Sequence, residues 1–184
     1  MNSWTRQTII MIQVFTCLMK FIKHITFIIF IIVGNITFVQ SQNIPIFDKF
    51  DDFEKAVILN NDTTYVINFW ATWCVPCIKE LPFFEVFKDS IGDKKIKVLL
   101  VSLDSKKQID SHLKPFLKKH QYTSQVVSLT DNAYNAWIDR IDPEWSGSIP
   151  ATLLISGGKK AFEERSFESH EDLAQFVFSF IHSL

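Results

Sequence analysis

The feature that most constrains this chain is a pair of apolar, β-branched runs separated by a stretch of helical character. Residues 64–70 read TYVINFW and residues 96–103 read IKVLLVSL, and both are long enough for buried strands. Their near-continuous apolar character indicates a sheet that helices cover on both faces. The segment from Cys74 to Ser90 is predicted to be a helix, so that the two strands pair in parallel through a right-handed crossover. Pro82 is expected to kink that helix.

Further elements are predicted before and after this unit. A glycine pair, Gly157-Gly158, indicates a tight turn and an antiparallel hairpin. Ser169 is expected to cap the last helix. The lysines within residues 106–120 are expected to form a solvated face rather than a site for an anionic partner. The spacing of apolar residues predicts helices over residues 47–59, 106–120, 132–141 and from Ser169 onward, and strands over 126–129, 152–155 and 161–167.

The first 41 residues differ from the remainder and are expected to form a leader. They contain three basic residues and no Asp or Glu, and residues 25–39 form an apolar run that follows the basic residues. This run is shorter than the roughly 20 residues that span a bilayer. The layout predicts a signal peptide cleaved before Gln42, or alternatively an uncleaved membrane anchor, followed by a domain over residues 42–184. A start at Met19 would give a more compact basic head, and we predict it as the true start.

The charge balance argues against a nucleic-acid-binding function. The chain of 184 residues has 19 Lys and Arg against 20 Asp and Glu, and without the leader 16 remain against 20. A mildly acidic domain lacks the basic surface that a phosphate backbone requires. The 47% hydrophobic and 21% charged content is that of a globular chain, which argues against a disordered one.

Two cysteines, Cys74 and Cys77, carry the chemistry that the sequence predicts. They lie directly after a predicted buried strand and at the start of a predicted helix. Two intervening residues let the sulfurs close a small ring, and a helix N-terminus stabilises a thiolate at the first cysteine. We expect Cys74 to attack a partner disulfide and Cys77 to resolve the mixed disulfide, which leaves the pair oxidised. The reverse sequence of steps oxidises a substrate.

Two structural interpretations compete with this redox chemistry. An inert disulfide over so short a loop would restrict the unfolded chain very little. A zinc site usually needs four protein ligands, and the sequence after the leader has no second CxxC motif. The nearest downstream histidines, His112 and His120, are expected to have surface or packing roles. We therefore predict no metal ion and no organic cofactor.

Two separated segments resemble the thioredoxin superfamily. Residues 66–82, VINFWATWCVPCIKELP, resemble its active-site segment, and FWATWC followed by Glu80 and Pro82 is most similar to the TlpA-like exported thiol-disulfide oxidoreductases. Residues 145–152, WSGSIPAT, resemble the segment that contains the family's cis-proline. The resemblance covers residues 45–184 and implies a thioredoxin-like three-layer α/β/α sandwich with a central mixed β-sheet.

The resemblance also implies roles for residues around the cysteines. Pro150 would be cis and lie against the pair, so that the backbone of Ile149 can pair with an extended substrate segment. Trp73 would shield the sulfurs and offer an apolar contact surface to a substrate, with a core role as the alternative. Asn68 stands where thioredoxin has a buried aspartate that serves the resolving cysteine, and asparagine cannot titrate. Glu80 matches the substitute proposed within the TlpA-like branch, with a solvated helix glutamate as the alternative.

The expected function is that of an exported, periplasmic thiol-disulfide oxidoreductase that reduces protein disulfides, generally or in cytochrome c maturation. The resemblance implies protein thiol or disulfide substrates and a membrane-linked electron donor, with membrane contact only through an uncleaved leader. The direction stays open between reductant and disulfide-forming oxidant, because the residues between the cysteines do not fix a reduction potential. A metal-delivery protein of this fold would space its cysteines by three residues. A peroxide-reducing relative would need Thr where this chain has Ala71.

Overall fold

The computed structural model describes Met19, Lys23 and residues 43–184 apart from residues 59, 60 and 93. The chain divides into two units, Met1–Gln42 and Asn43–Leu184. The predicted leader, its cleavage point and the predicted start at Met19 concern a part of the chain that, apart from two helical residues, lies outside the described residues. None of the helices formed by the described residues is both long and apolar enough to cross a membrane.

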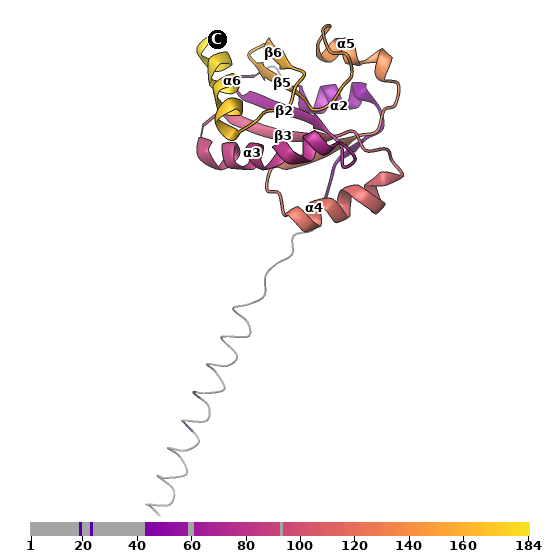
Figure 1. The fold of residues 1–184 in the computed structure, drawn as a ribbon, viewed down its shortest axis with the longest axis vertical. Coiled ribbons are helices and arrows are strands. Elements are labelled where there is room, and N and C mark those ends of the chain that lie inside the picture. The colour runs from indigo at the N-terminus through magenta and orange to yellow at the C-terminus, as the bar shows by residue number, and fades with distance from the viewer. Residues whose placement is uncertain (1–18, 20–22, 24–42, 59–60, 93) are drawn as a thin grey trace, which may run out of the picture. The chain divides into compact units, whose positions relative to one another are not determined.

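The second unit is built on a mixed six-stranded sheet with the strand order β1-β4-β3-β2-β5-β6 (Figure 1). The first four strands in that order are parallel, whereas β5 runs antiparallel to β2, and β6 runs antiparallel to β5. The strands are β1 (Ile46–Phe47), β2 (Thr64–Trp70), β3 (Ile96–Ser102), β4 (Gln125–Leu129), β5 (Ala151–Ser156) and β6 (Lys159–Glu163).

Helices cover both faces of this sheet, as the predicted three-layer α/β/α sandwich requires (Figure 1). Side chains of α3, α4 and α6 pack with Val66 and Trp70 on one face, and those of α2 and α5 pack with Ile67 and Phe69 on the other. Every residue of β2 is buried, which confirms that the sheet is covered on both sides. The helices are α2 (Phe50–Val57), α3 (Val75–Ile91), α4 (Lys114–His120), α5 (Ile138–Ile141) and α6 (His170–His182), with a π turn over Ile109–Leu113 and a 3₁₀ turn over Tyr134–Ala136.

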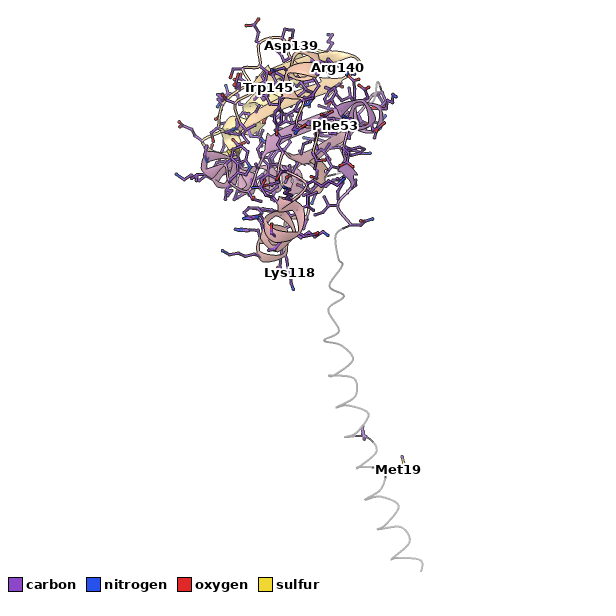
Figure 2. The ribbon with its side chains drawn as sticks, turned by 90° about the vertical axis from the view of Figure 1, so that its right-hand side faces the viewer. Met19, Phe53, Lys118, Asp139, Arg140 and Trp145 are labelled. Carbon is purple, nitrogen blue, oxygen red and sulfur yellow. A yellow bond between two sulfur atoms is a disulfide. The ribbon has the colours of Figure 1, made fainter. Side chains whose placement is uncertain are left out.

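The predicted helices 47–59 and 106–120 are both shorter in the structure. The first begins at Phe50 because Ile46 and Phe47 form the edge strand β1 beside β4. The second begins as a π turn, in which the amide of Lys114 bonds to the carbonyl of Ile109, and continues as α4. Pro115 lies in the first turn of α4, where a residue without an amide hydrogen is readily accommodated. The lysines of this segment are exposed, and Lys118 projects into solvent (Figure 2).

Three local predictions are confirmed. The hairpin of β5 and β6 turns at Gly157 and Gly158, which have φ angles of 54° and 81°, and a two-residue hairpin turn of this kind favours glycine at both positions. The side chain of Ser169 caps α6 by accepting a hydrogen bond from the amide of Asp172. β2 and β3, which precede and follow α3 in the sequence, pair in parallel. α3 continues through Pro82 as one helix, and the predicted kink at Pro82 stays a prediction.

Candidate active site

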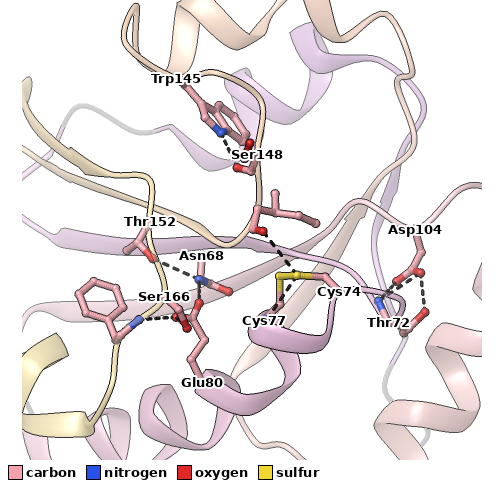
Figure 3. The surroundings of a disulfide bond; sticks show 12 residues. Asn68, Thr72, Cys74, Cys77, Glu80, Asp104, Trp145, Ser148, Thr152 and Ser166 are labelled. Carbon is pink, nitrogen blue, oxygen red and sulfur yellow. Dashed lines mark hydrogen bonds between the residues drawn. A yellow bond between two sulfur atoms is a disulfide. The ribbon is translucent and has the colours of Figure 1, made fainter.

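The two cysteines form a disulfide where β2 passes into α3 (Figure 3). β2 lies in the middle of the sheet, and its last residue, Trp70, is fully buried in the core. The chain therefore leaves a rigid strand only three residues before Cys74. Ligands and substrates of open α/β sheets bind at the carboxyl ends of the parallel strands, which is where the disulfide lies.

The N-terminus of α3 surrounds Cys74 with backbone donors. Cys74 is the N-cap residue, and the amide of Cys77 lies 3.3 Å from its Sγ atom. Pro76 in the first turn contributes no amide hydrogen, so this contact comes from the next available donor. Free amides and the helix dipole stabilise negative charge at this position, which favours a thiolate on Cys74 once the disulfide is reduced.

The two cysteine residues differ in their exposure to solvent. Cys74 keeps 5% of its surface exposed, whereas Cys77 is completely buried. A partner sulfur can therefore approach Cys74 and not Cys77. The structure supports the predicted order of attack, in which Cys74 reacts with the partner and Cys77 acts from inside.

The loop that precedes β5 lies against Cys74. The peptide between Ile149 and Pro150 is cis, as the resemblance implies, and the carbonyl oxygen of Ile149 is 3.6 Å from Cys74 Sγ. Within this loop, the indole N–H of Trp145 donates a hydrogen bond of 2.8 Å to the carbonyl oxygen of Ser148 (Figure 3). The predicted neighbourhood of Pro150 and the cysteine pair is therefore present in the structure.

Glu164, the residue after β6, forms hydrogen bonds to the same loop. Glu164 accepts hydrogen bonds from the amides of Ser146 and Ser148 over 2.9 Å and 3.0 Å, and from the Ser146 hydroxyl. Partial burial raises the pKa of Glu164, but these hydrogen bonds outweigh it and leave the pKa below its ordinary value. Sequence reasoning missed Glu164, because it lies 14 residues beyond Pro150 and belongs to no motif.

Glu80 is buried and hydrogen-bonded, so the alternative of a solvated helix glutamate is wrong. It lies three residues after Cys77 in α3 and has no exposed surface. One oxygen accepts from Asn68 Nδ2 at 2.8 Å, and the other accepts from the amide of Phe167 at 2.7 Å and the hydroxyl of Ser166 at 3.2 Å (Figure 3). Asn68 Nδ2 also donates to Thr152 over 3.1 Å.

The surroundings of Glu80 bring its pKa close to neutral pH. Burial raises the pKa of Glu80 from 4.5 to about 7, and the donors from Phe167, Asn68 and Ser166 limit the rise. A carboxyl group with a pKa near 7 can both accept and release a proton at neutral pH. Glu80 is one helical turn from Cys77, and its role as an acid or base for that residue stays a prediction.

An aspartate that follows β3 forms hydrogen bonds to the loop that precedes Cys74 in the sequence. Asp104, two residues after the end of β3, is buried and accepts hydrogen bonds from the hydroxyl of Thr72 at 2.6 Å and from its amide at 3.1 Å. The hydroxyl of Ser102 donates to the same carboxylate over 2.8 Å. Asp104 was not predicted as a site residue, although a buried strand followed at once by aspartate is a usable signal.

Two apolar side chains beside the disulfide are open to solvent. Trp73 is 58% exposed and Val75 is 62% exposed, so the alternative of a core role for Trp73 is wrong. Large exposed apolar groups at a reactive site are typical of a surface that contacts another molecule. Buried Ala71 occupies the position at which a peroxide-reducing relative would need a hydroxyl.

Comparison with known proteins agrees with this arrangement. Sporulation thiol-disulfide oxidoreductase A of Bacillus subtilis (strain 168) is 32% identical over 74 residues, which are 40% of this chain and 45% of that protein. Thiol-disulfide oxidoreductase ResA of Bacillus thuringiensis subsp. konkukian is 32% identical over 112 residues, which are 60% of each. The chain thus spans about half the length of these curated relatives. Both names agree with the predicted resemblance to thiol-disulfide oxidoreductases.

A solved structure confirms the predicted thioredoxin-like fold. The crystal structure of StoA from Bacillus subtilis matches 65% of this chain and 86% of its own with a TM-score of 0.51, at 24% identity. The chain also matches the AhpC/TSA family over residues 40–160, which is well over half of its length. This chain therefore belongs to the AhpC/TSA family of thioredoxin-like proteins.

Proposed function

We propose that this protein is an exported thiol-disulfide oxidoreductase that reduces disulfides of partner proteins outside the cytoplasm. The observation that carries the proposal is the position of Cys74 Sγ. It lies at the N-terminus of α3, with the carbonyl of Ile149 at 3.6 Å, in a residue that keeps 5% of its surface exposed while its disulfide partner is completely buried. The names of the two relatives support the same chemistry.

The reaction proceeds by two exchanges of sulfur bonds. The Cys74 thiolate attacks one sulfur of a partner disulfide, which forms a mixed disulfide and releases the other partner sulfur as a thiolate that takes up a proton. Cys77 then loses its proton and attacks Cys74, which breaks the mixed disulfide and releases the second partner thiol. The partner gains two electrons and two protons, and the Cys74–Cys77 pair is left oxidised. Buried Glu80 takes up the proton of Cys77 during the second exchange.

The partner is held by the apolar and backbone groups around Cys74. Trp73 contributes exposed apolar surface on one side of the disulfide, and the backbone of Ile149 is available to an extended segment of the partner. Pro150 has no amide hydrogen, so this position of the loop has no donor that could compete for the backbone acceptors of the partner segment. The hydrogen bonds from the loop to Glu164 keep Ile149 in place while the partner binds.

Two parts of this proposal, export and the reducing direction, rest on evidence from outside the site. The sequence of residues 1–41 supports export, and the resemblance to exported reductants supports the direction. A membrane-linked donor would return two electrons to the pair after each cycle. Fractionation of the cells that make the protein, with an antibody to residues 43–184, tests the location, and a cytoplasmic pool alone contradicts it.

The central experiment equilibrates the full chain with mixtures of reduced and oxidised glutathione and measures the fraction of oxidised Cys74–Cys77. A Cys17→Ser background removes the third cysteine of the chain. We expect reversible cycling at a potential near the thioredoxin value of about −270 mV, and none in the Cys74→Ser variant. A potential near −120 mV would reverse the direction to disulfide formation, and a pair that does not cycle would refute the enzymatic function.

A further inference from the structure

Asn68 has a buried amide oxygen without a hydrogen-bond partner in the structure. Its side chain is completely buried, and both of its assigned hydrogen bonds use Nδ2, toward Glu80 Oε1 and toward Thr152 Oγ1. Oδ1 accepts no hydrogen bond. An unpartnered buried acceptor is costly and rare, so its presence beside a reactive group calls for a physical reason.

The topology places Asn68 on the face of the sheet that carries the resolving cysteine. Residues of β2 alternate between the two faces, and Val66 and Trp70, two positions either side of Asn68, belong to the same core cluster as Cys77. Asn68 therefore faces α3, and its bond to Glu80 fixes it one helical turn from Cys77. In Figure 3 the amide nitrogen of Asn68 points to Glu80 and Thr152, and the oxygen is turned to the side where Cys77 lies.

We propose that Asn68 Oδ1 is the hydrogen-bond acceptor for the thiol of Cys77 in the reduced protein. The oxidised pair has no proton to offer, which explains why the oxygen has no partner in the disulfide form described here. Reduction by two glutathione thiols breaks the Cys74–Cys77 bond, forms one glutathione disulfide and leaves a proton on Cys77. That S–H group is a new donor on the side of Cys77 to which the oxygen is turned (Figure 3). The proposal rests on the redox cycle proposed above and adds a residue that sets its equilibrium.

The energetic consequence has a definite sign. In the oxidised protein the buried oxygen carries a desolvation cost, and in the reduced protein the thiol relieves it. Asn68 therefore stabilises the dithiol relative to the disulfide and makes the pair a weaker reductant than it would be otherwise. Replacement by an apolar residue of similar size removes this preference, so the equilibrium with glutathione moves toward the disulfide by on the order of two- to tenfold.

The first test measures that equilibrium constant in the full chain with Cys17→Ser, alone and with Asn68→Leu. Ser128→Ala is the matched control, because Ser128 Oγ is also fully buried and without a partner, but lies in β4, two strands away from β2. Thr152→Val is a second control, since it removes the other contact of Nδ2 and leaves Oδ1 in place. We expect a shift toward the disulfide in Asn68→Leu and a change of less than about twofold in both controls.

The outcomes separate this inference from the proposed function. If Asn68→Leu cycles with an unchanged equilibrium constant, the role of Asn68 is refuted while the oxidoreductase function stands. If the wild-type pair does not cycle, both are refuted.

A spectroscopic test does not depend on the folding of the Asn68 variant. In a chain with Cys17→Ser and Cys74→Ser, Cys77 is the only thiol, and its S–H stretching band reports its hydrogen bonding. We expect a band at the lower frequency of a hydrogen-bonded thiol. A band at the frequency of a thiol in hydrocarbon solvent would overturn the proposal.

Discussion

Replacement of Glu80 by glutamine tests whether burial raises the pKa of Glu80. Burial raises the pKa of Glu80 to about 7, whereas the same group in the unfolded chain keeps its ordinary value near 4.5. Between these two values the folded protein binds a proton that the unfolded chain has lost, so the free energy of unfolding must fall as the pH rises. The contribution is complete below the unfolded pKa and is lost as the pH passes the folded pKa.

The size of the effect follows from the same two values. Each pKa unit is worth ~1.4 kcal/mol, so the wild-type protein is expected to lose about 3 kcal/mol of stability from this group between about pH 4 and pH 8. Glutamine has a similar shape and does not titrate, so Glu80→Gln should lack this loss. A constant penalty for the mismatched amide, about 1–3 kcal/mol, lowers its whole curve without changing the slope.

The assay is urea unfolding of the oxidised full chain at a series of pH values, for wild type and Glu80→Gln. The quantity of interest is the difference between the two stability curves, in which all other titrating groups cancel. We expect that difference to change by about 3 kcal/mol across this range in favour of the variant as the pH rises. Two parallel curves would refute the assignment of a raised pKa to Glu80.

Three further variants test the surroundings of the disulfide. Trp73→Ala should change the free energy of unfolding by less than about 0.5 kcal/mol, because the side chain is exposed, yet slow exchange with protein disulfides more than with glutathione. Asp104→Asn should cost about 2 kcal/mol in urea unfolding, since its amide cannot accept all the bonds from Thr72 and Ser102. Glu164→Gln should slow exchange with protein substrates, and the wild-type rate should fall in the same way when acid protonates Glu164 below its lowered pKa.

The sequence was sufficient for most of the fold because its signals were strong and local. The run from Thr64 to Trp70 is apolar throughout, and the structure buries it on both faces. The glycine pair of the hairpin and the cap of the last helix also act over a few residues. The edge strand β1 has only two residues, which is too short for any periodic pattern, and its pairing with β4 depends on contacts far along the chain.

The site residues that form a sequence motif were predictable. Those that are distant in the sequence and come together only in the fold were not. Cys74 and Cys77 follow from their spacing, and Pro150 from the flanking residues that match a family. Asp104 and Glu164 bind backbone groups 32 and 18 residues away, at Thr72 and Ser146, and no spacing rule connects them. Such contacts become visible only when the sheet order is known.

The polar side chains of the site divide into two kinds, which should affect different quantities. Asp104 and Glu164 hold backbone groups on either side of the disulfide, and these anchors do not depend on the oxidation state of the sulfurs. An interaction that is equal in both states cancels in the redox equilibrium constant, so their removal should change stability or exchange rates and leave that constant unchanged. Glu80 lies one helical turn after Cys77 and is bonded to Asn68, and the proton of Cys77 is present only in the reduced form. Their removal should change the equilibrium itself, and comparison of rates with equilibrium constants across these variants separates positioning from redox tuning.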